Sequence, residues 1–551
     1  MSSSPPEKYF TNNNRLFSIF KREYLFVILC IICSLLFFFE LGSRTFETHD
    51  VPRYAEMARD MLHSGDWLVT KYQGHIYLSK PPMLMWLIAF FSSFTDHITP
   101  LTARLPNALA GIAGVLITYY FARKFFSKRI AFLSAIILAI SQKYFWHGRE
   151  ARTDMLFTVF VTLSFYFFYL GYRQKKWFYS IFYFALVLAV LTKGPLGIIF
   201  VLSVIIVYLA LQKNLSAIKT MKWEWGVAIF ALTIGIWGSI FCLKVGIKPI
   251  MSTVKSELFT RINDPISHAE PFYYYFVSVW ADYAPWTLFI PFACIYTYKK
   301  WREGNPHHTF LFCWIVVIFI FLFISKAKSS RYMLPIFPAL SILIANLISD
   351  VFENTILQPK WLARATRWII FATAIIAAIT LVGMPYYLIK NIWIGAFISI
   401  GTILMLIKLY RYFFERKKIL KATLTFIIII TTAGWLVYIH QLTVQSNRDS
   451  FGPGLIKVVN EEALGWKSNI ICGYQLDRDI WNIINLNLNT CVPRLTDQNE
   501  LRQFLNSVDA NPVCIIEKVV FDKIKENILD DSLKTIDIKS RKHPLVVLTK
   551  K

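Results

Sequence analysis

The stretch Leu25-Phe-Val-Ile-Leu-Cys-Ile-Ile-Cys-Ser-Leu-Leu-Phe-Phe-Phe-Glu40 carries no charged residue before its last position. A membrane-spanning helix needs about 20 apolar residues, so this run with its flanks predicts a transmembrane helix. Runs of the same kind recur at residues 25–40, 104–121, 130–141, 155–170, 178–192, 196–211, 225–243, 272–298, 308–325, 333–349, 368–388, 391–409 and 422–440. We therefore expect an all-α polytopic membrane domain with about 13 transmembrane helices.

The composition points to the same class of protein. Of the 551 residues, 56% are hydrophobic and 17% are charged, and the mean hydropathy is +0.47. Soluble domains contain about half apolar and a quarter charged residues. The net charge of +25 could suggest nucleic-acid binding. In a membrane protein, however, basic residues usually reflect orientation, so we expect no nucleic-acid partner.

The basic residues follow a pattern along the chain. They gather before the first apolar run and in every second loop after it, at Lys21, Arg22, Arg123, Lys124, Lys128, Arg129, Arg173, Lys175, Lys176, Lys213, Lys219, Lys222, Lys299, Lys300, Arg302, Lys360, Arg364, Arg367, Arg411, Arg416, Lys417, Lys418 and Lys421. Short loops rich in Lys and Arg face the cytoplasm. The N-terminus is therefore expected inside, and an odd number of spans puts the C-terminal tail outside.

The same pattern divides the chain into segments. Residues 1–20 are expected to be a cytoplasmic tail, and residues 21–441 the membrane domain, with external loops at 42–103 and 244–271. Within the first external loop, the stretch from Val51 to His63 has helical character.

Residues 442–551 are expected to form a small α/β domain outside the membrane. The apolar runs at 469–473, 512–516 and 544–548 have the length of strands, and stretches with helical periodicity separate them. About 110 residues are enough to hold a separate core.

The external loops carry specific charges. The first contains Glu47-Thr-His-Asp50-Val-Pro-Arg53-Tyr-Ala-Glu56, followed by Lys80-Pro-Pro. Later external loops and turns contain Arg149, Glu150, Arg152, Asp154, Lys193, Arg261, Asp264, His268, Lys326, Lys328 and Arg331, with Tyr332 next in the chain. Ionisable groups at a membrane edge are functional candidates, because burying them is costly. One external cavity that holds a carboxylate and several cations would explain them, and it suits a phosphate-bearing lipid.

These motifs resemble a known family of membrane enzymes. The matching pieces, in order, are Arg53-Tyr-Ala-Glu, Ser64-Gly-Asp-Trp, Tyr77-Leu-Ser-Lys-Pro-Pro, Asp154-Met, Leu191-Thr-Lys-Gly, His268-Ala-Glu-Pro-Phe-Tyr-Tyr-Tyr, Ala284-Pro-Trp, Lys326-Ala-Lys and Arg331-Tyr-Met-Leu-Pro. Together they resemble the integral-membrane glycosyltransferases of the GT-C superfamily, above all the lipid A 4-amino-4-deoxy-L-arabinose transferases. The protein O-mannosyltransferases are more distant relatives. The resemblance extends over roughly residues 40 to 345, and each piece is weak without the others.

The resemblance implies a function and a location. The expected reaction is an inverting transfer of a sugar from undecaprenyl phosphate to lipid A or a related envelope glycolipid. It implies a multi-pass protein of the bacterial inner membrane, with the active site facing the periplasm and membrane lipids around it. In the family, this modification of lipopolysaccharide is linked to polymyxin resistance. The identity of the sugar and of the acceptor stays open.

The resemblance also assigns candidate site residues. Asp50 matches the acid at the catalytic centre, and Asp154 matches a second acid that organises the site. The expected ligands of the donor phosphate are Arg53, Lys80, Arg261 and Tyr332. A metal ion has less support, because Ser79 stands where the family often has a Glu before the Lys. No cofactor is expected with certainty, and His268 is the candidate ligand for a divalent metal ion.

Two other functions remain open at this point. The acceptor could be a Ser or Thr of a protein, which would make the enzyme a protein O-glycosyltransferase. The chain could also be a transporter or flippase of a lipid-linked sugar. Transporters place charges near the bilayer midplane and often contain internal repeats. Here the charges lie in external loops and no repeat is visible, which favours an enzyme.

Overall fold

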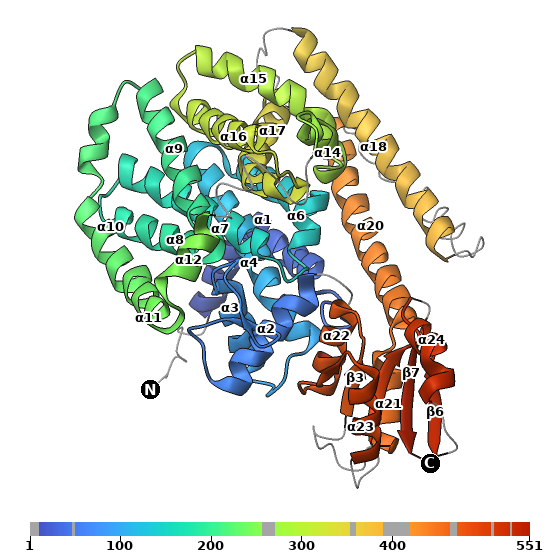
Figure 1. Ribbon diagram of the computed structural model, residues 1–551. Helices are drawn as coiled ribbons and strands as arrows, with labels where there is room; N and C mark the ends of the chain where they lie inside the picture. Colours follow the sequence, from blue (N-terminus) through green and yellow to red (C-terminus); the bar gives the residue numbers. More distant parts are fainter. Residues whose placement is uncertain are drawn as a thin grey trace, which may run out of the picture.

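The structure is a computed structural model that describes residues 10–46, 50–255, 270–352, 360–389, 419–462, 471–507, 512–528, 532–540 and 542–550. Within these residues the chain is mostly helical (Figure 1). The helices coloured blue to yellow gather into one body. A sheet formed by the last residues, coloured red, lies at one end of this body.

The first part of the helical body contains the elements that surround the predicted site. These are α1 (Phe10–Phe38), α2 (Asp50–Ser64), α3 (Met83–Ser92), α4 (Pro100–Phe125), α5 (Lys128–Ile140), α6 (Gln142–His147), α7 (Thr153–Arg173), α8 (Phe178–Lys193) and α9 (Leu196–Leu211). A short antiparallel hairpin of β1 (Lys71–Tyr72) and β2 (His75–Ile76) follows α2. The helix predicted from Val51 to His63 is confirmed as α2.

The second part continues the body and leads to the sheet. Its elements are η1 (Leu215–Thr220), α10 (Trp223–Phe230), η2 (Ala231–Gly235), α11 (Ile236–Val245), α12 (Ile247–Lys255), α14 (Tyr274–Asp282), η4 (Thr287–Phe289), α15 (Ile290–Arg302), α16 (Pro306–Ile324), η5 (Ser330–Ile336), α17 (Phe337–Phe352), α18 (Lys360–Ile389) and α20 (Ile419–Asp449). In Figure 1, α18 and α20 run along one side of the body, and α20 ends beside the sheet.

Six stretches of the described residues are long and apolar enough to cross a membrane: Pro100–Phe125, Thr153–Arg173, Trp223–Val245, Pro306–Ile324, Ser330–Phe352 and Thr423–Glu461. Four shorter apolar helices accompany them, at Tyr24–Phe38, Met83–Ser92, Phe178–Lys193 and Leu196–Leu211. The span expected at 391–409 lies outside the described residues. The total of about 13 spans therefore stays a prediction.

The helix α3 differs from the sequence expectation. It lies within the stretch 42–103, which was expected to be an external loop, yet it is apolar and packs against α2 and α4. With 10 residues it is about 15 Å long, half the thickness of a bilayer core. It is therefore too short to cross a membrane by itself, and it packs against α2 and α4.

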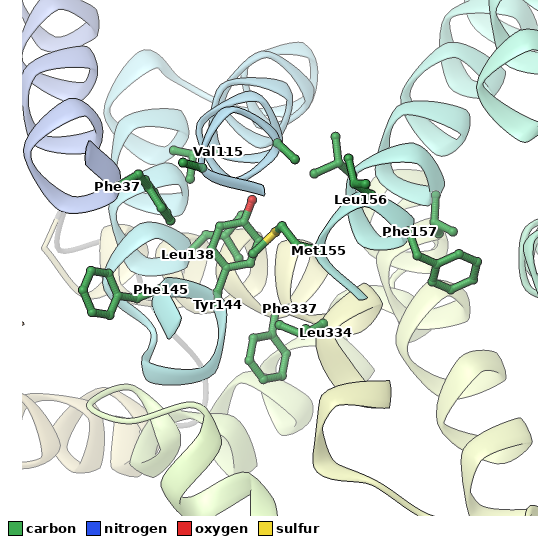
Figure 2. Close-up of a cluster of buried hydrophobic side chains, with 14 of the residues drawn as sticks. Phe37, Val115, Leu138, Tyr144, Phe145, Met155, Leu156, Phe157, Leu334 and Phe337 are labelled. Carbon is green, nitrogen blue, oxygen red and sulfur yellow. The ribbon is translucent and has the colours of Figure 1, made fainter. Parts of the chain in front are cut away.

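Buried apolar side chains from several helices meet in one cluster (Figure 2). The labelled members are Phe37, Val115, Leu138, Tyr144, Phe145, Met155, Leu156, Phe157, Leu334 and Phe337. The hydroxyl of Tyr144 donates to Gly111 O at 2.9 Å, so this buried polar group is satisfied. Because Met155 follows Asp154 in the chain, this packing fixes the start of α7 directly beside a predicted site residue.

The C-terminal sheet has the strand order β4-β3-β5-β7-β6. Its strands are β3 (Ile471–Tyr474), β4 (Arg494–Leu495), β5 (Val513–Glu517), β6 (Leu533–Ile538) and β7 (Leu545–Lys550), and its helices are α21 (Gly452–Glu462), α22 (Arg478–Leu488), α23 (Gln498–Ser507) and α24 (Lys518–Ile528). The strand β3 pairs in parallel with β4 and β5, and β7 pairs antiparallel with β5 and β6. The three apolar runs expected as strands overlap β3, β5 and β7 at the centre of the sheet.

The sheet with its helices α21, α22, α23 and α24, called the sheet module below, contacts α2 and β1 through α22. The fully buried side chain of Asn485 donates to Glu56 Oε1 at 3.2 Å. Its neighbour Asn482, also fully buried, donates to the hydroxyl of Tyr72 at 2.8 Å. Glu56 lies on α2, so the helix that begins at Asp50 is held by the sheet module on one side and by the helical body on the other.

Candidate active site

Four helix ends and one turn bring charged side chains to one place. Asp50 is the first residue of α2, and Asp154 lies in the first turn of α7. Carboxylates are favoured at helix N-termini, where the helix dipole is positive. Lys193 is the last residue of α8, where a cation is favoured for the opposite reason. Arg331 lies at the start of η5, and Arg152 lies in the turn before α7.

Asp50 is bound by three guanidinium groups. Arg53, one helical turn further along α2, contacts its Oδ1 at 2.5 Å. Arg152 contacts its Oδ2 at 2.8 Å, and Arg331 contacts the same oxygen at 3.2 Å. These contacts use three of the roughly four lone-pair positions of a carboxylate. Among the described residues, this leaves Asp50 with room for about one further hydrogen-bond donor.

Asp154 forms a second, more buried centre beside the first. Lys193 Nζ lies 2.5 Å from its Oδ1, and the two side chains are 10% and 7% exposed. Arg331 Nε lies 3.9 Å from Asp154 Oδ2, so one arginine connects the two carboxylates. Lys193 also lies 4.9 Å from the centre of the Tyr332 ring, a distance typical of a cation–π contact.

The cluster has an excess of positive charge. Its cations are Arg53, Arg152, Lys193 and Arg331, and its anions are Asp50 and Asp154. Four cations against two carboxylates leave a net charge of +2. The carboxylate of Asp50 is 21% exposed, whereas that of Asp154 is 7% exposed. The open layer of the site is therefore rich in guanidinium groups, which suit a phosphate ligand.

Two neighbouring groups outside the spanning helices keep a fixed charge state. Burial lowers the pKa of His147 to about 3, so this imidazole is neutral at pH 7. Burial alone would lower the pKa of the Arg53 guanidinium. Tyr54, Tyr77 and Asp50 outweigh that effect and raise it. Arg53 therefore remains charged, and His147 adds no charge to the cluster.

The other predicted site residues have different outcomes. Lys80 lies just before α3 and donates to Ser79 O at 2.9 Å. Its role as a phosphate ligand stays a prediction. Arg261 and His268 lie outside the described residues. Among the described residues, no group of three or more His, Cys, Asp and Glu side chains could hold a metal ion. These residues do not fit a metal centre, and no step of the proposed chemistry uses one.

Three residues contact the carboxylates without having been assigned a role from the sequence. Arg152, Lys193 and Arg331 were noted there as charges in external turns. The available signal was their position, since each lies between apolar runs in a turn that the sequence predicts to be external. What the sequence lacked was the pairing, because the partners lie 39 or more residues apart in the chain.

Comparisons with known proteins show what the chain is similar to. The family model described as dolichyl-phosphate-mannose-protein mannosyltransferase matches residues 79–237. An uncharacterized protein from Aquifex aeolicus is 29% identical over 391 residues, which cover 68% of this chain and 76% of its own. An undecaprenyl phosphate-alpha-4-amino-4-deoxy-L-arabinose arabinosyl transferase from Pectobacterium atrosepticum is 26% identical over 359 residues, or 61% of this chain. The chain spans 62% of the length of that Pectobacterium protein.

Solved structures share the fold over nearly the whole chain. The crystal structure of ArnT from Cupriavidus metallidurans bound to undecaprenyl phosphate has a TM-score of 0.77 at 18% identity. The match covers 96% of this chain and 98% of that chain. The apo oligosaccharyltransferase of Archaeoglobus fulgidus has a TM-score of 0.53 at 12% identity, covering 91% of this chain and 70% of that one.

The fold, the relatives and the charged centre define the class of this protein. The relatives and the fold support a glycosyltransferase similar to the GT-C enzymes, and several of its described helices are long and apolar enough to cross a membrane. Within that class it is close to the 4-amino-4-deoxy-L-arabinose transferases. An enzyme is therefore the correct interpretation, rather than a transporter or flippase.

Proposed function

We propose that the protein transfers a sugar from undecaprenyl phosphate to lipid A or a related envelope glycolipid at the periplasmic face of the membrane. The candidate sugar is 4-amino-4-deoxy-L-arabinose, because relatives such as the Pectobacterium protein carry that name. The observation that carries the proposal is the carboxylate of Asp50 within contact distance of three arginines. Such a centre combines a carboxylate that can orient or deprotonate an acceptor with guanidinium groups that can bind a phosphate.

The donor phosphate is expected in the open layer of the site. Arg53, Arg152 and Arg331 are each partly exposed, and each can turn from Asp50 toward a phosphate oxygen. Guanidinium groups bind phosphate through paired hydrogen bonds, which fixes its orientation. Lys80 and Arg261, assigned by the resemblance, would add two further cations. Tyr332, which lies over Lys193, would border the same phosphate.

In the proposed reaction the protein stabilises charge and forms no covalent bond to the sugar. An acceptor oxygen attacks the anomeric carbon of the sugar from the face opposite the phosphate. The bond between that carbon and the phosphate oxygen breaks, and undecaprenyl phosphate leaves with the electron pair. Attack from the opposite face inverts the anomeric configuration. The surrounding cations stabilise the negative charge that develops on the leaving phosphate.

The role of Asp50 depends on the acceptor. A hydroxyl acceptor must lose its proton as it attacks, and Asp50 would take that proton as general base. A phosphate group of lipid A is already ionised, so there Asp50 would orient the acceptor or balance the arginines. Asp154 would hold Lys193 and Arg331 in place in both cases.

The sheet module is part of the same proposal. We assign residues 1–20 to the cytoplasm, residues 21–441 to the catalytic membrane domain and residues 442–551 to a periplasmic domain. The support is the alternation of basic loops along the sequence. The module contributes none of the residues of the charged cluster described above. It would instead cover the site or help to seat the acceptor.

A second candidate acceptor is a protein. The match of residues 79–237 to a family named for protein mannosyltransferases favours this alternative. It keeps the donor and the charged centre and changes the acceptor to a Ser or Thr hydroxyl. In that case Asp50 must act as a base.

Mass spectrometry of lipid A tests the proposal directly. Cells that express the protein should carry lipid A with one added sugar, and cells without it should lack this mass. A strain that expresses Asp50→Asn at equal level is the matched control and should resemble the deletion. Unmodified lipid A in all three strains, together with a glycosylated envelope protein that disappears on deletion, would replace the proposal with the protein acceptor.

A further inference from the structure

We infer that Arg104 and Asn107, two side chains on one face of α4, position Asp50 and Arg152 relative to each other. They are positioning residues, because both are buried and hold backbone carbonyl groups of two neighbouring segments. The inference deepens the proposed function and rests on it for the meaning of the transfer assay. The helix α4 holds together two chain segments, residues 41–45 and residues 147–152.

Arg104 holds the segment that leads to Asp50. Its Nη1 donates to Leu41 O at 3.3 Å and to Arg44 O at 2.5 Å. Its Nη2 donates to Thr45 O at 2.9 Å. The side chain is 1% exposed, so water cannot replace these bonds. Three carbonyl groups of this segment are thereby tied to one guanidinium group a few residues before α2 begins.

Asn107 holds the segment that carries Arg152. This side chain, fully buried one turn after Arg104, donates through Nδ2 to Arg152 O at 2.7 Å and to Glu150 O. A longer contact of 3.4 Å reaches His147 O. The guanidinium group of Arg152 contacts Asp50 at 2.8 Å. Asn107 is therefore linked to the proposed catalytic acid through a single residue, Arg152.

An ion pair joins the two segments to each other. Arg44 of the first segment pairs with Glu150 of the second, and the two side chains are 7% and 9% exposed. Arg44 also lies 5.2 Å from the centre of the Trp146 ring. Separating a buried ion pair leaves an unpaired buried charge, which is strongly unfavourable. The two segments are therefore expected to keep their positions relative to each other and to α4.

This arrangement has a consequence for catalysis. A capping box of Thr99 and Thr102 closes the first turn of α4, and Pro106 lies inside the helix between Arg104 and Asn107. Arg104 and Asn107 tie residues 41–45 and residues 147–152 to this helix. A displacement of about 1 Å between reacting groups can cost 100-fold in rate, so holding the separation of Asp50 and Arg152 affects the reaction directly.

A double-mutant cycle tests the inference. Asn107→Leu keeps the volume of the side chain and removes both N–H donors. It should weaken binding of undecaprenyl phosphate to the purified protein by about 3- to 10-fold, the effect of displacing a contacting group. Sugar transfer should fall by about 10-fold or more. In an Arg152→Ala background, adding Asn107→Leu should change either quantity by less than about 2-fold, because the positioned group is gone.

A control on the same helix separates positioning from general stability. Thr118→Val removes a buried hydrogen bond of 2.8 Å to Gly114 O, far from the site, and should leave binding and transfer at the wild-type level. If Asn107→Leu does not fold, Glu150→Gln replaces it in the cycle, because it removes the charge that pairs with Arg44.

Two results would overturn the inference. One is wild-type binding and transfer in the folded Asn107→Leu or Glu150→Gln protein. The other is a loss of binding or transfer that is as large in the Arg152→Ala background as in the wild-type protein. Failure of the proposed function looks different. A wild-type protein that binds undecaprenyl phosphate but transfers no sugar would refute the proposed reaction, while the binding cycle would still decide the positioning role.

Discussion

At the scale of single residues, the site is a balance between two carboxylates and four cations. Asp154 and Lys193 form its most buried pair, with Nζ and Oδ1 2.5 Å apart. A buried charge without its partner costs several kcal/mol, whereas removing both partners can be nearly neutral. This difference makes the pair suitable for a stability experiment that does not depend on activity.

We expect Lys193→Met to lower the stability of the protein by about 3 kcal/mol, because it leaves Asp154 charged and buried. Asp154→Asn should also destabilise, because Lys193 then lacks its partner. The double variant should be more stable than the sum of the two losses predicts, with a coupling of about 1 kcal/mol or more. Thermal unfolding in detergent measures all four proteins. Strictly additive losses would show that the two groups do not form a pair.

The donor phosphate gives a second prediction for single residues. Lys80→Ala and Arg261→Ala should each raise the KM for the polyprenyl-phosphate sugar by about 10-fold, since each removes one cation from the phosphate site. The kcat should change less than the KM. The KM for the acceptor should stay near its wild-type value. Donor-concentration kinetics on the two purified variants measure this, and an unchanged donor KM in both would remove them from the phosphate site.

Single residues also show how far the sequence can predict a site. Asp50, Arg53, Asp154 and Tyr332 were selected from the sequence, and the structure brings them together with Lys193. The pairings themselves could not be predicted. Which cation meets which acid depends on how α2, α7, α8 and η5 pack, and local patterns carry no information on such long-range contacts.

At the scale of elements, the site depends on where helices end. The helix α8 ends at Lys193, and the next residue, Gly194, has φ +70° and ψ −150°. Residues with a Cβ atom rarely adopt this conformation. Glycine therefore allows the chain to turn directly after Lys193, and it fixes where the ammonium group points.

We expect Gly194→Ala to destabilise the protein by about 1 to 3 kcal/mol and to reduce activity, because the backbone strain shifts Lys193. Gly238→Ala is the matched control. At both glycines an added Cβ atom would meet no atom within 4 Å, but Gly238 has no positive φ. The control should be neutral or slightly stabilising, since Ala favours a helix. Equal effects of the two substitutions in thermal unfolding would contradict the role of the turn.

Elements also differ in how well they could be predicted. The central strands β3, β5 and β7 are continuous apolar runs because both faces are buried, and the sequence shows them clearly. The edge strands β4 and β6 are short or polar, so they carry no such signal. The apolar helix α3 was not predicted, because the stretch 42–103 was expected to be an external loop. Its 10 residues were too few for a span, and sequence alone does not show what a short apolar helix packs against.

At the scale of the whole molecule, orientation decides which side of the membrane the reaction uses. The alternation of basic loops predicts that the N-terminus lies in the cytoplasm and the sheet module in the periplasm. A fusion of alkaline phosphatase after Lys551 should therefore be active, and a fusion of β-galactosidase at the same position should be inactive. The same pair of reporters fused after Arg302, in a basic loop, is the control and should give the opposite result. An active β-galactosidase after Lys551 would change the number of spans by one and would move the sheet module to the cytoplasm.

In the proposed function, Asp50 and the arginines around it carry out sugar transfer from a polyprenyl phosphate. The most direct measurement uses purified protein, undecaprenyl phosphate charged with 4-amino-4-deoxy-L-arabinose, and lipid A, with the product detected by mass spectrometry. Asp60→Asn, on the same helix but outside the charged cluster, is the control and should transfer at the wild-type rate. We predict that the wild-type protein forms modified lipid A and that folded Asp50→Asn loses about 100-fold or more of this rate. Transfer by Asp50→Asn at more than about a tenth of the wild-type rate would contradict the account, because a group at the catalytic centre cannot be replaced at so small a cost.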